Sequence, residues 1–514
     1  MIRKLGWTTI LSGLLVGTIA PAGDLVGTWI VQPLSPSGVI PTVYVFTQRH
    51  GALGGIWRRG FIDVPLRDLK LEGDKVSFIA DVSDDYFLTM HGTVNGADLY
   101  LAQTGSSGSE FAPVRTHKAA ADDLVRMARD TPRNMKKGRL PLPALHEVPA
   151  NGLARFPPMG WNSWNQFAEK ADDRLIREVA DAMVASGLRD AGYVYVNIDG
   201  GWQGMRDSKG ALHPNAKFPD MKSLADFVHS RGLKLGLYSS PGPIACGDYV
   251  GSHGYEREDA AMFARWGVDL LKYDWCSAGA LYKTQTEMRA VYQKMGDALR
   301  ATGRPIVYSL CQYGLFDVGS WGRAVGANLW RTGEDLVAGD RWANVSRNGF
   351  ETHGNPDNAG PGGWNDADIL VIGMDGLTDT EARTHMTLWS ILASPLLLGN
   401  DVRNMSSATR SLLLNREVIA IDQDALGKQG HLARRMGSSE VWVKPLADGS
   451  TAIAIFNRGA SPMDIDVRWP EIGLPGAHEL RDLWEHTDLG RYPDGYHVLL
   501  PAHGSSLLRA TVGQ

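Results

Sequence analysis

The sequence predicts a (β/α)₈ TIM barrel between an N-terminal all-β module and a C-terminal antiparallel β-sandwich. Eight short apolar runs in the middle of the chain each end in polar residues, and six of the seven intervals between those ends are 34 to 39 residues. Helical patterns separate most of the runs, whereas the flanking regions alternate short strands with turn residues. The 514 residues carry a net charge of −5, so the composition indicates a folded protein of several domains without a nucleic-acid partner.

Residues 1–22 have the pattern of an export signal. Arg3 and Lys4 precede an apolar run from residue 6 to 19, and Ala20-Pro21-Ala22 supplies small residues before a cleavage point. A buried or membrane helix is the alternative, but the run is shorter than the ~20 residues that a membrane span needs. No later segment has 18 uninterrupted apolar residues. We therefore expect a secreted or periplasmic protein that has no membrane association once the signal is removed.

Residues 23–115 are predicted to form the N-terminal β module. Runs such as 42–46 and 98–101 are separated by turn residues at intervals of about ten, which favours a small barrel or sandwich. The opening Gly27-Thr28-Trp29 and the closing Phe111-Ala112-Pro113 resemble lipocalin-like modules. Residues 116–150 are charged and then proline-rich, as expected of a linker.

Residues 151–425 are predicted to form the barrel. Helical patterns such as 173–185 and 221–229 lie between the apolar runs, and a strand, a crossover helix and a return strand together need ~30 residues. Residues 426–514 return to short alternating strands, which predicts the C-terminal sandwich. The polar ends of the eight runs mark the strand ends at which barrel enzymes carry their chemistry. They lie near Trp161, Asp199, Tyr238, Asp274, Gln312, Arg331, Asp366 and Asn400.

The segment from 268 to 276 is the most informative for chemistry. Strand alternation places Lys272, Asp274 and Cys276 on one face, which points inward at the barrel mouth. A carboxylate beside an ammonium group stays ionised, and an ionised, oriented carboxylate can attack the anomeric carbon of a sugar. The alternative interpretation is a structural ion pair between Lys272 and Asp274.

The segment from 329 to 335 supplies a second carboxylate. The guanidinium of Arg331 suits recognition of hydroxyl or carboxylate groups. Asp335 follows the strand in a loop, where partial burial could raise its pKa enough for it to act as an acid. Asp335 could instead cap the next helix, and Glu334 is the neighbouring rival for the acid role.

Further polar residues end other runs, and two of the three cysteines can be paired. Asp199, Tyr238, Asp366 and Asp368 could bind sugar hydroxyls; the carboxylates could also bind a divalent metal, but no histidine has ligand spacing with them, so we expect neither a metal nor an organic cofactor. Phosphate-loop and Gly-x-Ser-x-Gly motifs are missing from the sequence. Cys246 and Cys276 follow neighbouring strands, which predicts a disulfide and leaves Cys311 as a buried free thiol.

Five motifs resemble glycoside hydrolase family 27, the family of α-galactosidases and α-N-acetylgalactosaminidases. They are Pro158-Met159-Gly160-Trp161-Asn162-Ser163-Trp164, Leu271-Lys272-Tyr273-Asp274-Trp275-Cys276, Pro361-Gly362-Gly363-Trp364-Asn365-Asp366-Ala367-Asp368, and the segments 388–401 and 422–429. The resemblance covers roughly residues 155–510 and leaves out the N-terminal module. It implies retaining hydrolysis, with Asp274 as nucleophile and Asp335 as general acid/base, ~5–5.5 Å apart.

The same resemblance assigns substrate-binding positions. Asp199, Lys272 and Arg331 match residues that bind galactose hydroxyls, Trp161 and Tyr238 match pocket aromatics, and Cys246 and Cys276 match a family disulfide. Gln312 and Asp368 complete the substrate-binding residues that we expect from the motifs.

Two departures from the family pattern affect the predicted substrate. Gly200 follows Asp199 where the family usually has a second Asp, and Gln312 stands where many members have Glu. Losing a carboxylate that binds a hydroxyl can alter specificity strongly. The expected function is hydrolysis of terminal α-D-galactosyl residues in a carbohydrate substrate. The alternatives are a β-L-arabinopyranosidase, an α-N-acetylgalactosaminidase, an isomalto-dextranase, or a carbohydrate-binding protein that has lost catalysis.

Overall fold

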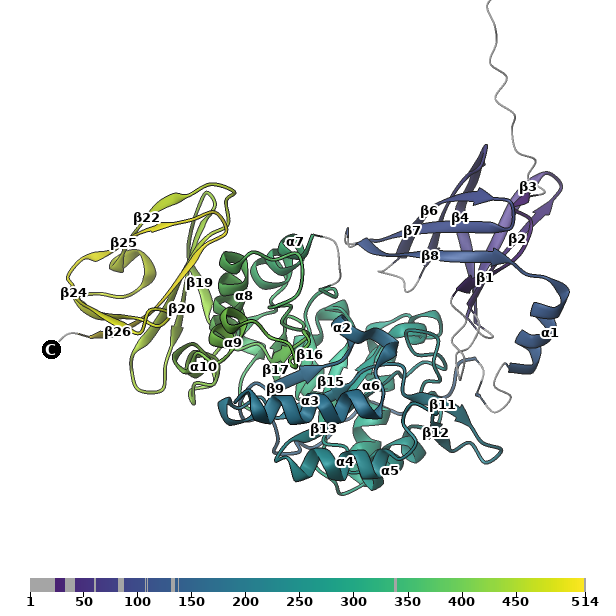
Figure 1. Ribbon diagram of the computed structural model, residues 1–514, viewed down its shortest axis with the longest axis horizontal. Helices are drawn as coiled ribbons and strands as arrows, with labels where there is room; N and C mark the ends of the chain where they lie inside the picture. The colour runs from purple at the N-terminus through teal and green to yellow at the C-terminus, as the bar shows by residue number, and fades with distance from the viewer. Residues whose placement is uncertain are drawn as a thin grey trace, which may run out of the picture.

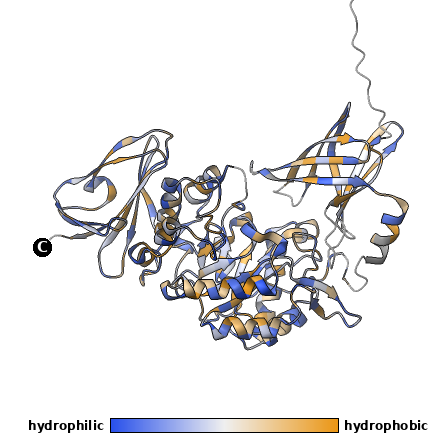
Figure 2. Ribbon diagram, in the orientation of Figure 1, coloured by the Kyte–Doolittle hydropathy of each residue, from blue (hydrophilic) through white to orange (hydrophobic). Residues whose placement is uncertain are grey.

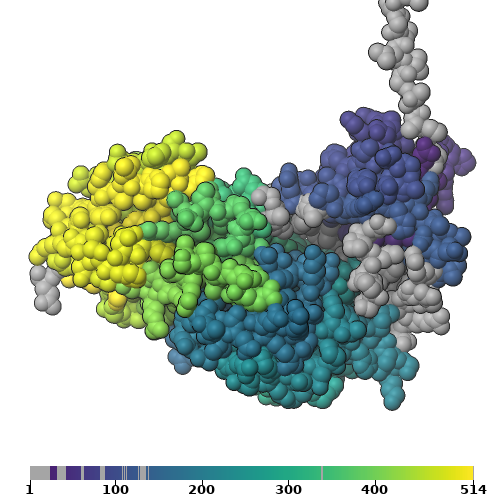
Figure 3. Space-filling model, viewed as in Figure 1, coloured from purple at the N-terminus to yellow at the C-terminus, as the bar shows by residue number. Residues whose placement is uncertain are grey.

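The computed structural model describes residues 24–32, 42–59, 62–81, 87–106, 108, 110–130, 135–136, 138–336 and 340–512. Three bodies follow one another along the molecule, with the central barrel between the N-terminal module and the C-terminal sandwich (Figures 1 and 3). The predicted fold class is thereby confirmed. The predicted signal, residues 1–22, lies outside the described residues and stays a prediction. None of the helices in the described ranges has the length and hydropathy that crossing a bilayer requires.

The N-terminal module is a closed barrel of eight antiparallel strands in sequence order, because β1 pairs with both β2 and β8. Hydrophobic and hydrophilic residues alternate along its strands (Figure 2), and the inner residues, among them Trp29, Tyr44 and Phe78, form a core of their own. This up-and-down order is that of lipocalin-like barrels. The strands are β1 (Gly27–Gln32), β2 (Thr42–Arg49), β3 (Ala52–Arg59), β4 (Ile62–Glu72), β5 (Lys75–Asp81), β6 (Phe87–Asn95), β7 (Asp98–Gly105) and β8 (Glu110–Lys118).

The predicted linker contains a helix and an extended segment. β8 continues to Lys118, past the predicted boundary at residue 115, and α1 (Ala121–Asp130) follows it. Residues 138–158, here called the strap, form neither helix nor strand. Backbone groups of the strap bond to the central barrel: Leu140 N donates to Tyr282 Oη at 3.0 Å, and Val148 N donates to Ala324 O at 2.8 Å. The strap therefore fastens the chain along the outside of the central barrel.

The central domain is a ring of eight parallel strands. An isolated bridge between Leu370 and Leu398 brings together its two outer strands, β17 and β18. Short runs that are buried along most or all of their length form these strands, as all five residues of β15 illustrate. In spatial order the strands are β17 (Trp364–Asp366), β16 (Leu329–Arg331), β15 (Val307–Cys311), β14 (Leu270–Asp274), β13 (Lys234–Ser239), β10 (Tyr195–Ile198), β9 (Met159–Asn162) and β18 (Leu396–Leu398).

Helices connect most of the parallel strands and cover the outside of the ring (Figure 1). The short interval between β15 and β16 holds only two 3₁₀ turns, η5 (Leu315–Ser320) and η6 (Gly322–Val325), which explains why it breaks the regular spacing. Capping boxes begin two of the helices, Thr284 with Glu287 at α6 and Thr378 with Glu381 at α8. The connecting helices are α3 (Asp173–Ala185), α4 (Met221–Ser230), α5 (Glu256–Trp266), α6 (Gln285–Ala301), α7 (Arg341–Ser346) and α8 (Asp379–Leu392).

The C-terminal domain contains a six-stranded antiparallel sheet and a two-stranded sheet that share one core. Strands β21 and β26 of the larger sheet pack on α8 of the central barrel, where Trp484 Nε1 donates to Thr387 Oγ1 at 3.0 Å. The strands are β19 (His431–Met436), β20 (Ser439–Pro445), β21 (Thr451–Asn457), β22 (Met463–Arg468), β23 (His478–Asp482), β24 (Thr487–Tyr492), β25 (Gly495–Leu500) and β26 (Ser505–Val512).

Candidate active site

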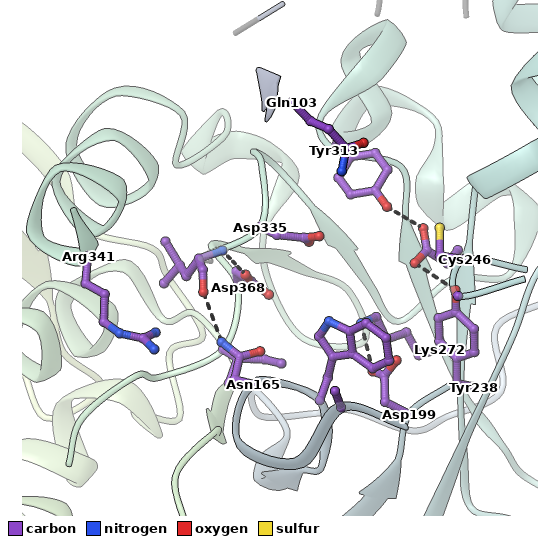
Figure 4. Close-up of a pocket in the computed structure, with 16 residues that line it drawn as sticks. Gln103, Asn165, Asp199, Tyr238, Cys246, Lys272, Tyr313, Asp335, Arg341 and Asp368 are labelled. Atoms are coloured by element: carbon purple, nitrogen blue, oxygen red, sulfur yellow. Dashed lines mark hydrogen bonds and ion pairs between the residues drawn. The ribbon is translucent and has the colours of Figure 1, made fainter. Parts of the chain in front are cut away.

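A cavity of about 570 Å³ lies at the carboxyl ends of the parallel strands. Six of the residues predicted from the sequence line it together (Figure 4). They come from β10, β13, β14, β16 and β17 or from the loops that follow these strands, so the strand ends converge as the sequence indicates. These residues are Asp199, Tyr238, Lys272, Asp274, Asp335 and Asp368.

Asp274 ends β14 and is buried, with both carboxylate oxygens oriented by phenols. Tyr313 Oη donates to Oδ1 at 2.8 Å, and Tyr238 Oη donates to Oδ2 at 3.1 Å. Burial raises the pKa of Asp274 to about 6; the charge of Lys272 opposes this rise and that of Asp335 adds to it. At pH 7 most molecules therefore hold Asp274 as a carboxylate.

Lys272 forms its ion pair with Asp199. Lys272 Nζ lies 2.9 Å from Asp199 Oδ2. The ion-pair partner of Lys272 is therefore Asp199, whereas the sequence suggested Asp274 as the alternative. Asn162 Nδ2 donates to the same oxygen at 2.9 Å, and Asp199 Oδ1 accepts from Gly200 N at 2.8 Å. The carboxylate of Asp199 is thus fixed at the cavity wall beside an ammonium group.

Asp335 lies nearer the cavity mouth than Asp274, since 35% of its side chain is exposed. Arg331, buried behind the wall, donates from Nη1 to Asp335 Oδ1 at 2.8 Å and lies 3.0 Å from Asp368 Oδ1. Burial raises the pKa of Asp368 to about 6, against the opposing charge of Arg331. Arg331 therefore positions both carboxylates without lining the main cavity itself.

The structure favours Asp335 over Glu334 as the acidic group of the site, and it shows that Asp335 does not cap the next helix. Glu334 is buried and does not line the cavity. The N-cap of α7 is Asp340, whose side chain accepts from Ala343 N. Asp335 is consequently the acidic group of this loop that faces the cavity.

Besides Arg331, two more of the predicted substrate-binding residues do not line the cavity. Trp161 lies in the hydrophobic core and donates its indole N–H to Asn400 O at 2.8 Å, so its place as a pocket aromatic is corrected. Trp164, which begins α2 (Trp164–Phe167) just after β9, lines the cavity instead. Gln312 is buried and donates from Nε2 to Arg331 O at 3.3 Å, whereas the adjacent Tyr313 faces the cavity.

Backbone strain marks three cavity residues other than glycine, the first of which is Ala168 with φ 46°. Tyr313 has φ 61° and Asp368 has φ 86°, both in the region that side chains other than glycine rarely adopt. Such residues concentrate at functional sites, where the surrounding structure holds them. Gly200 does not have a φ in that region. A Cβ added there would meet its nearest neighbours, including Tyr238, at 3.6 Å or more. The structure therefore leaves room for a Cβ atom at residue 200.

The predicted disulfide between Cys246 and Cys276 is confirmed, with Cα atoms 5.3 Å apart, and Cys311 is a buried free cysteine. The two sulfur atoms and a carboxylate oxygen of Asp274 lie close together. Because both sulfurs belong to the disulfide, this group offers an ion only the carboxylate.

The hydrogen bond from Tyr313 predicts a measurable pH effect. The free-enzyme kcat/KM should fall at acidic pH with a midpoint of about 6, as Asp274 becomes protonated. This bond lowers the pKa of Asp274, so Tyr313→Phe should move the acidic limb to higher pH. A pH–rate profile checks this, with the exposed Tyr100→Phe as control. An acidic limb that does not move in Tyr313→Phe would contradict the assignment to Asp274.

A buried carboxylate and a more exposed one on the same cavity, at the strand ends of a (β/α)₈ barrel, fit the paired acids that a glycoside hydrolase uses. The sequence model of alpha galactosidase A matches residues 156–424, and that of the alpha galactosidase C-terminal beta sandwich domain matches residues 436–510. The chain therefore belongs to the alpha-galactosidase family, which confirms the motif resemblance.

Individual relatives show how far the similarity extends. Alpha-galactosidase 3 of Arabidopsis thaliana is 44% identical over 362 residues, which are 69% of this chain and 81% of that protein. The crystal structure of alpha-galactosidase I from Mortierella vinacea has a TM-score of 0.67 and 36% identity, covering 71% of this chain and 98% of its own. A Bacteroides fragilis structure with a TM-score of 0.66 and 31% identity covers 95% of this chain and 99% of its own, so that similarity includes the N-terminal barrel.

Proposed function

We propose that this protein hydrolyses terminal α-D-galactosides with retention of configuration at the anomeric carbon. The observation that carries the proposal is the pair Asp274 and Asp335 on one cavity, the first buried and the second nearer the mouth. Family membership supports the reaction class, and the Arabidopsis and Mortierella proteins, both named alpha-galactosidases, support galactose as the glycone.

In the first step the carboxylate of Asp274 attacks the anomeric carbon of the bound sugar. The bond to the leaving-group oxygen breaks, and the carboxylic acid of Asp335 gives its proton to that oxygen. Tyr313 and Tyr238 hold the two oxygens of Asp274, so the attacking carboxylate keeps one orientation. The products are a glycosyl ester of Asp274 and the free leaving group.

In the second step water attacks the anomeric carbon of the ester. The carboxylate of Asp335 takes the proton of the water, and the bond to Asp274 breaks. Two displacements on the same carbon restore the original configuration. Arg331 contacts both Asp335 and Asp368, and we assign it a positioning role in both steps.

Recognition of the sugar is assigned to the groups around the nucleophile. The ammonium of Lys272 and the carboxylate of Asp199 can donate to and accept from sugar hydroxyls. Trp164 and Tyr238 offer flat apolar surface beside them. These groups are fixed by hydrogen bonds before substrate arrives, which favours a single orientation of the ring.

A panel of aryl glycosides tests the proposed glycone. We expect the largest kcat/KM for the α-galactoside, with lower values for the α-N-acetylgalactosaminide, the β-L-arabinopyranoside and the α-glucoside. The room at Gly200 makes this comparison necessary, because the wall beside Asp199 lacks a side chain there. Proton NMR of the first product should show α-galactose before mutarotation. A higher kcat/KM for another glycoside, or β-galactose as first product, would overturn the proposal.

A further inference from the structure

One residue that lines the catalytic cavity comes from outside the central barrel. Gln103 belongs to β7 of the N-terminal barrel, and it lines the same cavity as Asp274 and Asp335. Figure 4 shows its carboxamide reaching the cavity on the side where Tyr313 lies, away from Asp199 and Lys272. The N-terminal barrel therefore forms part of the wall around the site.

Two further observations place the N-terminal barrel against the segment that follows the nucleophile. β4 contacts η4 (Cys276–Ala280), which begins two residues after Asp274. The hydrogen bond from Arg67 is the main reason why the pKa of Asp81, at the end of β5, is lowered, and the charge of Lys283, just beyond η4, contributes to the same effect. The position of Gln103 thus belongs to a contact that involves several strands.

The local structure of β7 explains how Gln103 reaches the cavity. Its pairing with β8 shifts register between Leu101 and Gln103, near the end of the strand. Such irregularities re-aim side chains at barrel rims. Leu99 and Leu101 are fully buried in the N-terminal barrel, whereas Gln103 is only partly buried.

The leaving group of the substrate is expected on the side of the cavity mouth. Asp335, the proton donor, lies nearer the mouth than the buried Asp274, so the bond to the leaving group points outward from the inner sugar. The cavity of about 570 Å³ is larger than one hexose ring requires and lies within the ~300–1,000 Å³ of ordinary ligand sites. Gln103 and Arg341 both belong to its lining.

We propose that the N-terminal barrel forms the leaving-group subsite, and that Gln103 hydrogen-bonds a second sugar there. This inference rests on the proposed function. A carboxamide can both donate to and accept from hydroxyls, and the guanidinium of Arg341 adds donors to the same cavity. A sugar leaving group, with hydroxyls on several sides, matches these groups better than an apolar one.

The test compares two substrates that share the galactose and differ in the leaving group. One is a disaccharide of galactose α-linked to a second hexose; the other is α-galactosyl fluoride, whose leaving group cannot bond to Gln103. In Gln103→Ala the ratio of kcat/KM for the disaccharide to kcat/KM for the fluoride should fall about 3- to 10-fold, the effect of one neutral hydrogen bond. Gln103→Asn, which keeps the amide on a shorter side chain, should give a smaller fall.

Gln48→Ala is the matched control, because Gln48 is an exposed glutamine of the same barrel and does not line the cavity. Its substrate ratio should equal that of the unmodified protein. A ratio that stays within twofold in both Gln103 variants would overturn the subsite while leaving the proposed function intact. If the unmodified protein hydrolyses neither substrate, the proposed function itself fails.

Discussion

Replacing Asp274 with Asn is expected to abolish measurable hydrolysis of every galactoside, because the amide cannot form the glycosyl ester. The loss should exceed the ~10²–10⁴-fold that removal of an acid/base group costs. Steady-state assays on the disaccharide and on α-galactosyl fluoride measure it. The exposed Asp226→Asn on α4 is the matched control and should retain full turnover.

Asp335→Ala should behave differently from Asp274→Asn, since only the proton transfers are lost. We expect a ~10²–10⁴-fold fall for the disaccharide and a much smaller fall in the first step for the fluoride, whose leaving group needs little protonation. Added azide should restore the second step by attacking the ester without a base, and it should yield α-galactosyl azide. If both variants lose activity on the two substrates to the same extent, and azide restores none of it, the separate roles of Asp274 and Asp335 are wrong.

The second large effect concerns a buried ion pair in the central domain, between β11 (Gln203–Arg206) and α5. Arg206 and Asp259 are each 1% exposed, and Arg206 donates to both carboxylate oxygens, at 2.6 and 2.8 Å. Arg206 also donates to Gly251 O at 2.8 Å, which anchors the loop between Cys246 and α5. Arg206→Met should lower the free energy of unfolding by ~3–5 kcal/mol, because it leaves Asp259 buried without its partner.

Thermal unfolding of three variants tests this prediction. The midpoint should fall by roughly 6–20 °C in Arg206→Met. It should recover largely in Arg206→Met combined with Asp259→Leu, since two packed apolar side chains replace the pair. Arg174→Met is the control, because Arg174 is 85% exposed in its pair with Glu178 and should change stability by less than ~1 kcal/mol. A double variant as unstable as the single one would contradict the explanation.

The sequence was sufficient to predict the central barrel and its carboxylates. Buried parallel strands are apolar along most of their length, so the polar residues after Leu271 and Trp330 indicate that β14 and β16 are close to their ends. This signal does not depend on the lengths of the connecting helices. The sequence pattern could not decide whether Trp161 or Trp164 lines the cavity. Both indoles lie in one motif, and only the end of β9 at Asn162 and the start of α2 turn Trp164 toward the cavity.

Other site residues depend on tertiary contacts that no local pattern contains. Tyr313 faces Asp274 because its backbone adopts φ 61° directly after the buried Gln312. The sequence could have indicated Tyr313 only through its position, as a polar residue directly after the predicted strand end at Gln312. Gln103 had no such signal, because its role requires a separate barrel to pack beside the cavity.

The strap has a consequence for how the entrance is assembled. Asn151 and Val148 bond to the central barrel, so the polypeptide that carries the N-terminal barrel is already anchored a few residues before β9. The N-terminal barrel then packs beside the cavity as an intramolecular event. Its effective concentration at that place depends on the connecting segment and not on the concentration of the protein. The contribution of Gln103 to the entrance consequently does not change on dilution.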